Sequence, residues 1–184
     1  TELMPQVRRD LEDLVRIESV SADPARKAEV QRSADAVAEL LRAEGFEEVK
    51  VVTAADDGFA PAVLAKLPAQ PGQPTVLLYA HHDVQPENDP AEWDSPPWEP
   101  TERNGRLYGR GAADDKAGIM AHIAAIRALG DDLRVGVTMF IEGEEEVASA
   151  TLPALLDQHQ DYLRCDTIVI ADSGNWDIGV PALT

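Results

Sequence analysis

Two stretches near the start of the chain carry apolar residues at the spacing of one helical face. The first stretch covers 4–17, and the second ends before Gly45, a residue type that commonly follows a helix. The residues of these stripes are Val7, Leu11, Leu14 and Val15, followed by Val30, Val37, Leu40 and Leu41. The pattern therefore predicts two amphipathic helices before the first strand.

Short apolar runs at 49–51, 63–67 and 76–79 follow, and turn residues separate them. Farther along, the pattern predicts a helix, a strand, a helix and a strand over 119–126, 135–141, 152–163 and 167–171. Because strands alternate with helices, we expect one α/β domain, an α/β/α sandwich with a largely parallel mixed sheet. In such a sheet ligands bind outside the carboxyl ends of the strands.

A long proline-rich connection covers 84–105 and contains Trp93 and Trp98. A loop of this length inside a compact domain is usually either functional or disordered. The two tryptophans favour an ordered loop.

Charge and cysteine content narrow the range of partners. The 184 residues include 16 basic and 34 acidic ones, which gives a net charge of −18. This charge would repel nucleic acid and anionic membranes, so we expect neither as a partner. The single cysteine, Cys165, cannot form an internal disulfide, and no apolar run reaches the ~18 residues of a membrane span. With no leader sequence apparent at Thr1, we expect a cytoplasmic protein.

Acidic residues and a histidine follow three of the predicted strands. His81 and Asp83 end one apolar run, 142–146 contains four glutamates, and Asp172 follows the last predicted strand. Carboxyl ends of parallel strands lie along one edge of a sheet, so these groups are expected to meet. A neutral imidazole binds a metal better when a carboxylate holds its other nitrogen, which is the role expected of Asp83 behind His81. The pattern predicts a metal-dependent hydrolase.

The glycine-rich segment 107–116 contributes a further carboxylate, Asp114. It is not a phosphate-binding loop, because Asp115-Lys116-Ala117 stands where such a loop requires Gly-Lys-Ser/Thr. It is not a dinucleotide fingerprint either, because Asp114 occupies the third glycine position. Carboxylates facing one another favour a cation instead.

Four ordered segments together resemble a known family. They are similar to segments of the co-catalytic zinc hydrolases in the family of acetylornithine deacetylase and succinyl-diaminopimelate desuccinylase. The four segments are LLYAHHDVQP, LYGRGAADDKAG, FIEGEEEVAS and VIADS. Within that family they resemble the carnosinase-like dipeptidases. The resemblance implies hydrolysis of dipeptides, with N-acyl amino acids as the alternative substrates.

The same resemblance implies a role for each matching residue. His81 and Asp172 would bind a first zinc ion, Glu146 a second, and Asp114 would bridge the two ions. Asp83 would support His81, and Glu145 would act as the general base on a bridging water. Two zinc ions per complete site are implied, although carboxylate-rich sites also accept manganese or cobalt.

Other polar residues near these motifs have simpler interpretations. Glu142 and Glu144 are expected in a charged loop at a strand end, and Asp115 as a helix cap. Lys116 and Arg110 could pair with the acidic cluster. The remaining histidines are expected to be structural or solvated: His82, His122 and His159.

Enzymes of the family are longer than this chain. The resemblance implies that 1–184 is the N-terminal portion of the catalytic domain, without the lid or dimerisation domain and the C-terminal catalytic segment. The full-length protein could then form a homodimer. Histidines for the second zinc and the oxyanion would come from the missing segments, so we expect this chain alone to be inactive. A catalytically silent metal-binding subunit remains the alternative.

Overall fold

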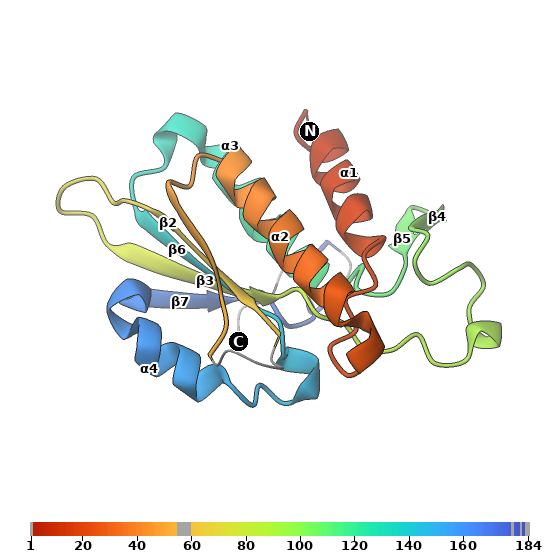
Figure 1. Cartoon of the computed structure of the whole chain (residues 1–184). Helices are drawn as coiled ribbons and strands as arrows, with labels where there is room; N and C mark the ends of the chain where they lie inside the picture. The colour runs from red at the N-terminus through yellow and green to blue at the C-terminus, as the bar shows by residue number, and fades with distance from the viewer. Residues whose placement is uncertain (1, 55–59, 178, 181, 183–184) are drawn as a thin grey trace.

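The computed structural model describes residues 2–54, 60–177, 179–180 and 182. Its centre is a five-stranded sheet, seen edge-on between layers of helices (Figure 1). In spatial order the strands are β1 (Glu48–Val52), β2 (Ala62–Leu67), β6 (Gly136–Glu142), β3 (Thr75–His81) and β7 (Thr167–Ile170). A separate two-stranded hairpin consists of β4 (Thr101–Arg103) and β5 (Arg106–Tyr108).

Strand direction confirms the predicted class of sheet. β3 runs parallel to both of its neighbours, β6 and β7, whereas β2 is antiparallel to β6 and to β1. Four of the five strands therefore run in one direction, and β2 alone is reversed. The sheet is mixed and largely parallel, as the alternation of strands and helices predicts.

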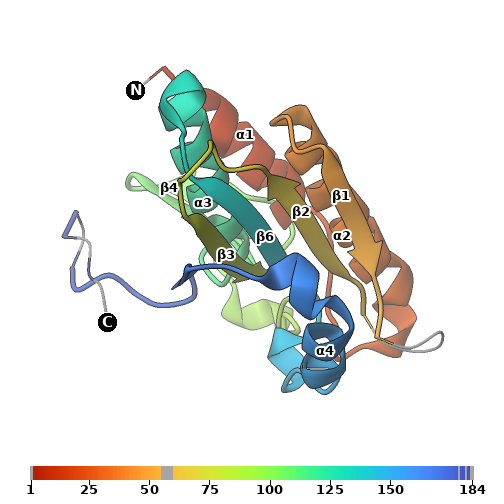
Figure 2. The same cartoon turned by 90° about the vertical axis from the view of Figure 1, so that its left-hand side faces the viewer.

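Helices cover both faces of the sheet, which completes the expected sandwich (Figure 2). On one face lie α1 (Met4–Val15), α2 (Lys27–Ala43) and α3 (Lys116–Leu129), and α4 (Leu152–Leu163) covers the other. Alternate residues of β6 pack into two hydrophobic cores, one on each face of the sheet. Met139 and Ile141 pack with the three helices, and Phe140 packs with α4. All seven residues of β6 are buried, because both faces of this central strand are covered.

The element boundaries differ slightly from the predicted ones. α1 ends at Val15 rather than at position 17, and β7 ends at Ile170 rather than at position 171. β7 is an edge strand, and its Ile168 and Ile170 are 59% and 61% exposed. Within the described residues, no helix has both the length and the apolar character that crossing a membrane requires.

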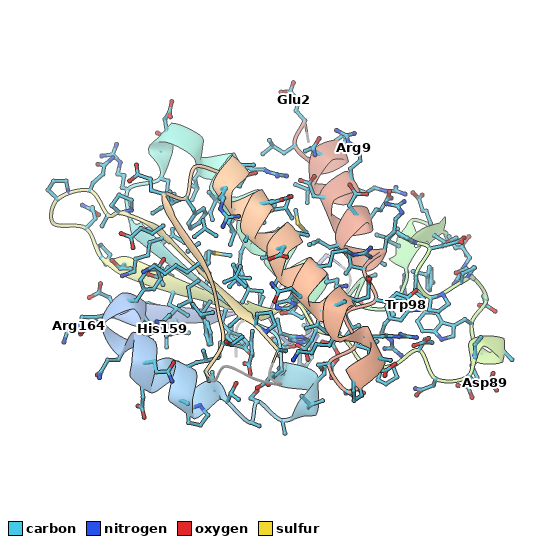
Figure 3. All side chains as sticks on the ribbon, viewed as in Figure 1. Glu2, Arg9, Asp89, Trp98, His159 and Arg164 are labelled. Carbon is cyan, nitrogen blue, oxygen red and sulfur yellow. The ribbon has the colours of Figure 1, made fainter. Side chains whose placement is uncertain are left out.

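The long connection after β3 is held by its tryptophans. The Trp93 indole donates a hydrogen bond to the main-chain oxygen of Glu87 at 2.8 Å. The Arg26 guanidinium lies 5.3 Å from the ring centre of Trp98, which projects from this loop in Figure 3. Arg110 lies at the same distance from Trp93. The aromatic side chains thus order the loop by packing against arginines from other segments.

Candidate metal centre and active site

The predicted site residues lie at the carboxyl ends of three adjacent parallel strands. His81 is the last residue of β3, and Asp172 follows β7 by two positions. Glu145 and Glu146 lie in a 3-10 turn, η4 (Glu145–Val147), directly after β6. Asp114 comes from the loop that leads into α3. The fold therefore brings together residues that are up to 91 positions apart.

The fully buried His81 ring is the centre of this cluster. Its Nε2 atom lies 3.0 Å from Asp114 Oδ1, and carboxylates from two other strand ends lie slightly farther away. The distances are 3.7 Å to Glu145 Oε2 and 3.9 Å to Asp172 Oδ1. One imidazole nitrogen thus faces three carboxylates from three different segments.

The other ring nitrogen of His81 faces Asp83. Nδ1 lies 3.0 Å from the Asp83 main-chain oxygen and 3.3 Å from its carboxylate Oδ1. The buried Asp83 carboxylate also accepts the main-chain N–H groups of Glu145 and Glu146, at 3.3 and 3.1 Å. A fourth donor is the Ser21 hydroxyl, at 2.6 Å. One carboxylate therefore fixes both the histidine ring and the turn that carries the two glutamates.

Burial and neighbouring charges shift the pKa values of these groups. Burial alone would lower the pKa of His81, but the hydrogen bond and charge of Asp83 raise it to about 10. Burial opposes ionisation of Asp83, yet hydrogen bonds from His81 and Ser21 lower its pKa below the ordinary value. Burial raises the pKa of Glu145, His81 opposes the rise, and neighbouring carboxylates add to it. These shifts favour a protonated His81 ring next to an ionised Asp83.

The donor set fits a divalent metal ion. Two groups of three side chains each place one ligand atom within 4.8 Å of the others. His81 is common to both, joined by Glu145 and Asp172 in one group and by Asp114 and Glu146 in the other. Imidazole with carboxylates suits zinc and similar ions. No lysine or arginine in the described part of the chain pairs with these carboxylates, so the arrangement leaves them available to a cation.

Two basic residues that could have neutralised the cluster have other partners. Lys116 is fully buried and its Nζ donates to the main-chain oxygens of Leu14 and Ile17, at 2.9 and 2.8 Å. Arg110 stacks on Trp93 instead. The interpretation that they pair with the acidic cluster is wrong, because the end of α1 and the tryptophan loop attract them.

Asp115 does not cap α3 through its side chain, contrary to the simplest interpretation. It occupies the N-cap position, but its buried carboxylate accepts the main-chain N–H of His81 at 3.2 Å. Burial raises its pKa to about 7. Gly118 leaves room for the Asp115 carboxylate, since a Cβ atom at position 118 would lie 2.1 Å from Asp115 Oδ1 and 2.3 Å from the Ala171 main-chain oxygen.

Glu142 and Glu144 are buried rather than part of a solvated charged loop. Glu142 accepts the Tyr79 hydroxyl at 2.7 Å. Glu144 accepts the main-chain N–H of Ala60 and both the N–H and the hydroxyl of Thr151. Neither glutamate is in a candidate ligand group of the described residues. Glu142 thus links β6 to β3, and Glu144 ties the turn after β6 to neighbouring segments.

The other histidines have structural surroundings. His82 is fully buried and its Nε2 contacts the Pro61 oxygen at 2.8 Å. His122 contacts the Tyr79 oxygen at 2.9 Å from α3. His159 lies on α4 at the edge of the molecule in Figure 3.

Sequence reasoning missed two supporting residues, Ser21 and Gln85. Ser21 reaches Asp83 because Val20 forms a parallel bridge with Val84. Gln85 donates to the Glu146 carboxylate at 2.6 Å. Nothing in the local pattern singles out either residue, because each contact spans about 60 positions.

Comparison with known proteins shows the family of this chain. Residues 77–183 match the model of peptidase family M20/M25/M40. The chain is 43% identical over 116 residues to the cysteinylglycine-S-conjugate dipeptidase of Corynebacterium striatum, covering 60% of this chain and 25% of the relative. It is 42% identical over 118 residues to the human beta-Ala-His dipeptidase, covering 61% of this chain and 23% of the relative.

Solved structures give the same result over nearly the whole chain. Human carnosine dipeptidase 1 matches with a TM-score of 0.86 and 34% identity, over 95% of this chain and 39% of that one. A dipeptidase from Saccharomyces cerevisiae also matches with a TM-score of 0.86, at 26% identity, over 95% and 40%. The chain thus spans at most about two fifths of the length of these proteins. Its sequence and its fold both show that it belongs to peptidase family M20/M25/M40.

Proposed function

We propose that this protein is a metal-dependent hydrolase of peptide-like amide bonds and acts on dipeptides. The observation that carries the proposal is the convergence of Asp114, Glu145 and Asp172 on one nitrogen of the buried His81. Dipeptidases among the relatives support the substrate class. N-acyl amino acids are the alternative substrates, supported by 42% identity over 81 residues to a succinyl-diaminopimelate desuccinylase of Acidovorax ebreus.

Each residue has a distinct task in the proposed reaction. His81, Asp114, Glu146 and Asp172 would hold two metal ions, with zinc as the first choice. Bound ions would polarise the scissile carbonyl and lower the pKa of a water molecule. Asp83 holds the His81 ring in place through Nδ1.

Glu145 is proposed as the general base. It would take a proton from the attacking water and pass it to the leaving amine. The raised pKa of Glu145 suits this proton transfer. A group that both accepts and donates a proton near neutral pH needs a pKa above that of an exposed glutamate. The main-chain N–H of Glu145 donates a hydrogen bond to Asp83, which fixes the position of the main chain at this residue.

Metal binding without hydrolysis is a second candidate for this chain by itself. Among the described residues, both candidate ligand groups depend on the same histidine, His81. The relatives contain residues beyond the stretch that matches this chain, and we propose that turnover needs the equivalent residues as well. Those residues would also supply any lid or dimer interface.

Metal stoichiometry tests the proposal. The chain is equilibrated with zinc, and unbound zinc is removed. The zinc that remains is measured by elemental mass spectrometry and divided by the protein concentration. We expect at least one tightly bound zinc ion, which is lost in H81A and kept in the matched control H159A. Equal zinc in both variants, or none in the unmodified chain, would refute the metal assignment.

Hydrolysis of Cys-Gly and β-Ala-His by the zinc-loaded protein tests the general base. If the chain turns over, E145Q should lower the rate by about 10²–10⁴-fold with bound zinc unchanged, and the exposed control E47Q should not. Zinc binding without hydrolysis would favour the second candidate.

A further inference from the structure

The side chain of Glu146 is held by the segment that follows β3. The amide of Gln85 donates to Glu146 Oε2 at 2.6 Å and to the main-chain oxygen of Glu146 at 3.2 Å. Asp83, two residues before Gln85, accepts the main-chain N–H of Glu146 at 3.1 Å. Main chain and carboxylate of Glu146 are therefore both tied to one short segment, 83–85.

This arrangement leaves the second carboxylate oxygen of Glu146 free of the amide. Glu146, Asp114 and His81 each place a ligand atom within 4.8 Å of the others. A free glutamate side chain would lose conformational entropy on binding an ion and would be repelled by Glu145 beside it. A hydrogen bond that orients the carboxylate beforehand removes part of that cost.

The chemistry of Gln85 suits this task. An amide donates a hydrogen bond without carrying charge, whereas a lysine or arginine at this position would neutralise Glu146 and compete with a cation. Gln85 is itself exposed. Core packing therefore gives no reason for a glutamine at this position, and its described contacts are with Glu146.

We propose that Gln85 is a positioning residue, which orients the Glu146 carboxylate toward the metal centre. The inference rests on the proposed function, in which Glu146 is a metal ligand. It adds a residue whose effect should be confined to the ion that Glu146 holds. Asp172 lies in the other ligand group, so an ion that depends on Asp172 should not respond to Gln85.

Zinc titration of the full chain in competition with a chromophoric chelator tests this inference. We expect Q85A to weaken by about 10–100-fold the binding step that E146A also weakens. The step that D172A weakens should stay unchanged in Q85A. The control Q73A replaces an exposed glutamine in a distant turn and should match the unmodified chain.

The double variant separates positioning from a general structural role. If Gln85 acts through Glu146, Q85A/E146A should bind zinc no more weakly than E146A alone, and the metal-free melting temperature of Q85A should match that of Q73A. Additive losses, or a Q85A isotherm equal to that of the unmodified chain while E146A is weakened, would overturn the inference alone. An unchanged isotherm in E146A would refute Glu146 as a ligand and Gln85 with it. Unchanged zinc binding in H81A would refute the proposed function.

Discussion

The Ser21 hydroxyl offers a sharp test of how the site is supported. It donates at 2.6 Å to the Asp83 carboxylate, which is fully buried and ionised through its contacts with His81 and Ser21. Hydrogen bonds to charged groups contribute about 1.5–3 kcal/mol to stability, against about 0.5–1.5 kcal/mol for neutral pairs. Replacing Ser21 with alanine should therefore lower the free energy of unfolding by about 1.5–3 kcal/mol.

Ser19 provides a matched control two residues earlier. Its buried hydroxyl donates to the main-chain oxygen of His82 at 2.7 Å, a neutral acceptor. Ser33 donates to the same oxygen at 3.3 Å, so that oxygen keeps a partner when Ser19 is removed. We therefore expect S19A to cost about 0.5–1.5 kcal/mol, less than S21A.

Urea unfolding of the chelator-treated protein, followed by tryptophan fluorescence, measures the difference. With a denaturant slope of about 2 kcal/mol per molar urea, S21A should lower the midpoint by about 0.8–1.5 M. S19A should lower it by about half as much. A midpoint in S21A equal to or above that of S19A would refute the reasoning that Asp83 is a buried charge stabilised by its donors.

Three further outcomes follow from the structure. Burial lowers the pKa of His122 below its ordinary 6.5, so the unfolded chain binds the extra proton and stability falls as the pH drops through 6.5. The loss between pH 7 and 5 should be smaller in H122Q, measured by urea midpoints. G118A should lower stability by about 1–3 kcal/mol despite the better helix propensity of alanine, because its Cβ would collide with Asp115 and Ala171; thermal melting shows whether it does. Zinc at about a hundred times its dissociation constant should stabilise the chain by about 2.7 kcal/mol in calorimetry, and a chelator should abolish the gain.

Local periodicity was enough to predict the layers of this fold. The apolar run at 76–79 corresponds to β3, and the apolar residues at 135–141 correspond to β6, because strands covered on one or both faces require apolar side chains. The ends of these strands also located the polar cluster, since parallel strands place their carboxyl ends on one edge of a sheet.

Exposure and side-chain partners near the site could not be read from the chain. Glu144 follows a strand within a run of acidic residues, yet it is buried because Thr151 and Ala60 satisfy its carboxylate. Lys116 sits beside two aspartates in the sequence, yet it donates to Leu14, which is 102 positions away. In each case a distant main-chain group replaces water as the partner, which no local pattern records.

The sequence by itself determined the four α-helices, the strands of the main sheet and the residue types available for chemistry, because these depend on neighbours within a few positions. It did not predict the hairpin of β4 and β5, whose first strand lies within the connection 84–105. Tertiary structure decided the strand order β1-β2-β6-β3-β7 and the reversal of β2. It also decided that Ser21, Gln85 and Asp115 support the site, through contacts between segments that meet only in the folded chain. Hydrogen bonds of this kind depend on atomic positions set by the whole packed core, and not by the spacing of residues along the chain.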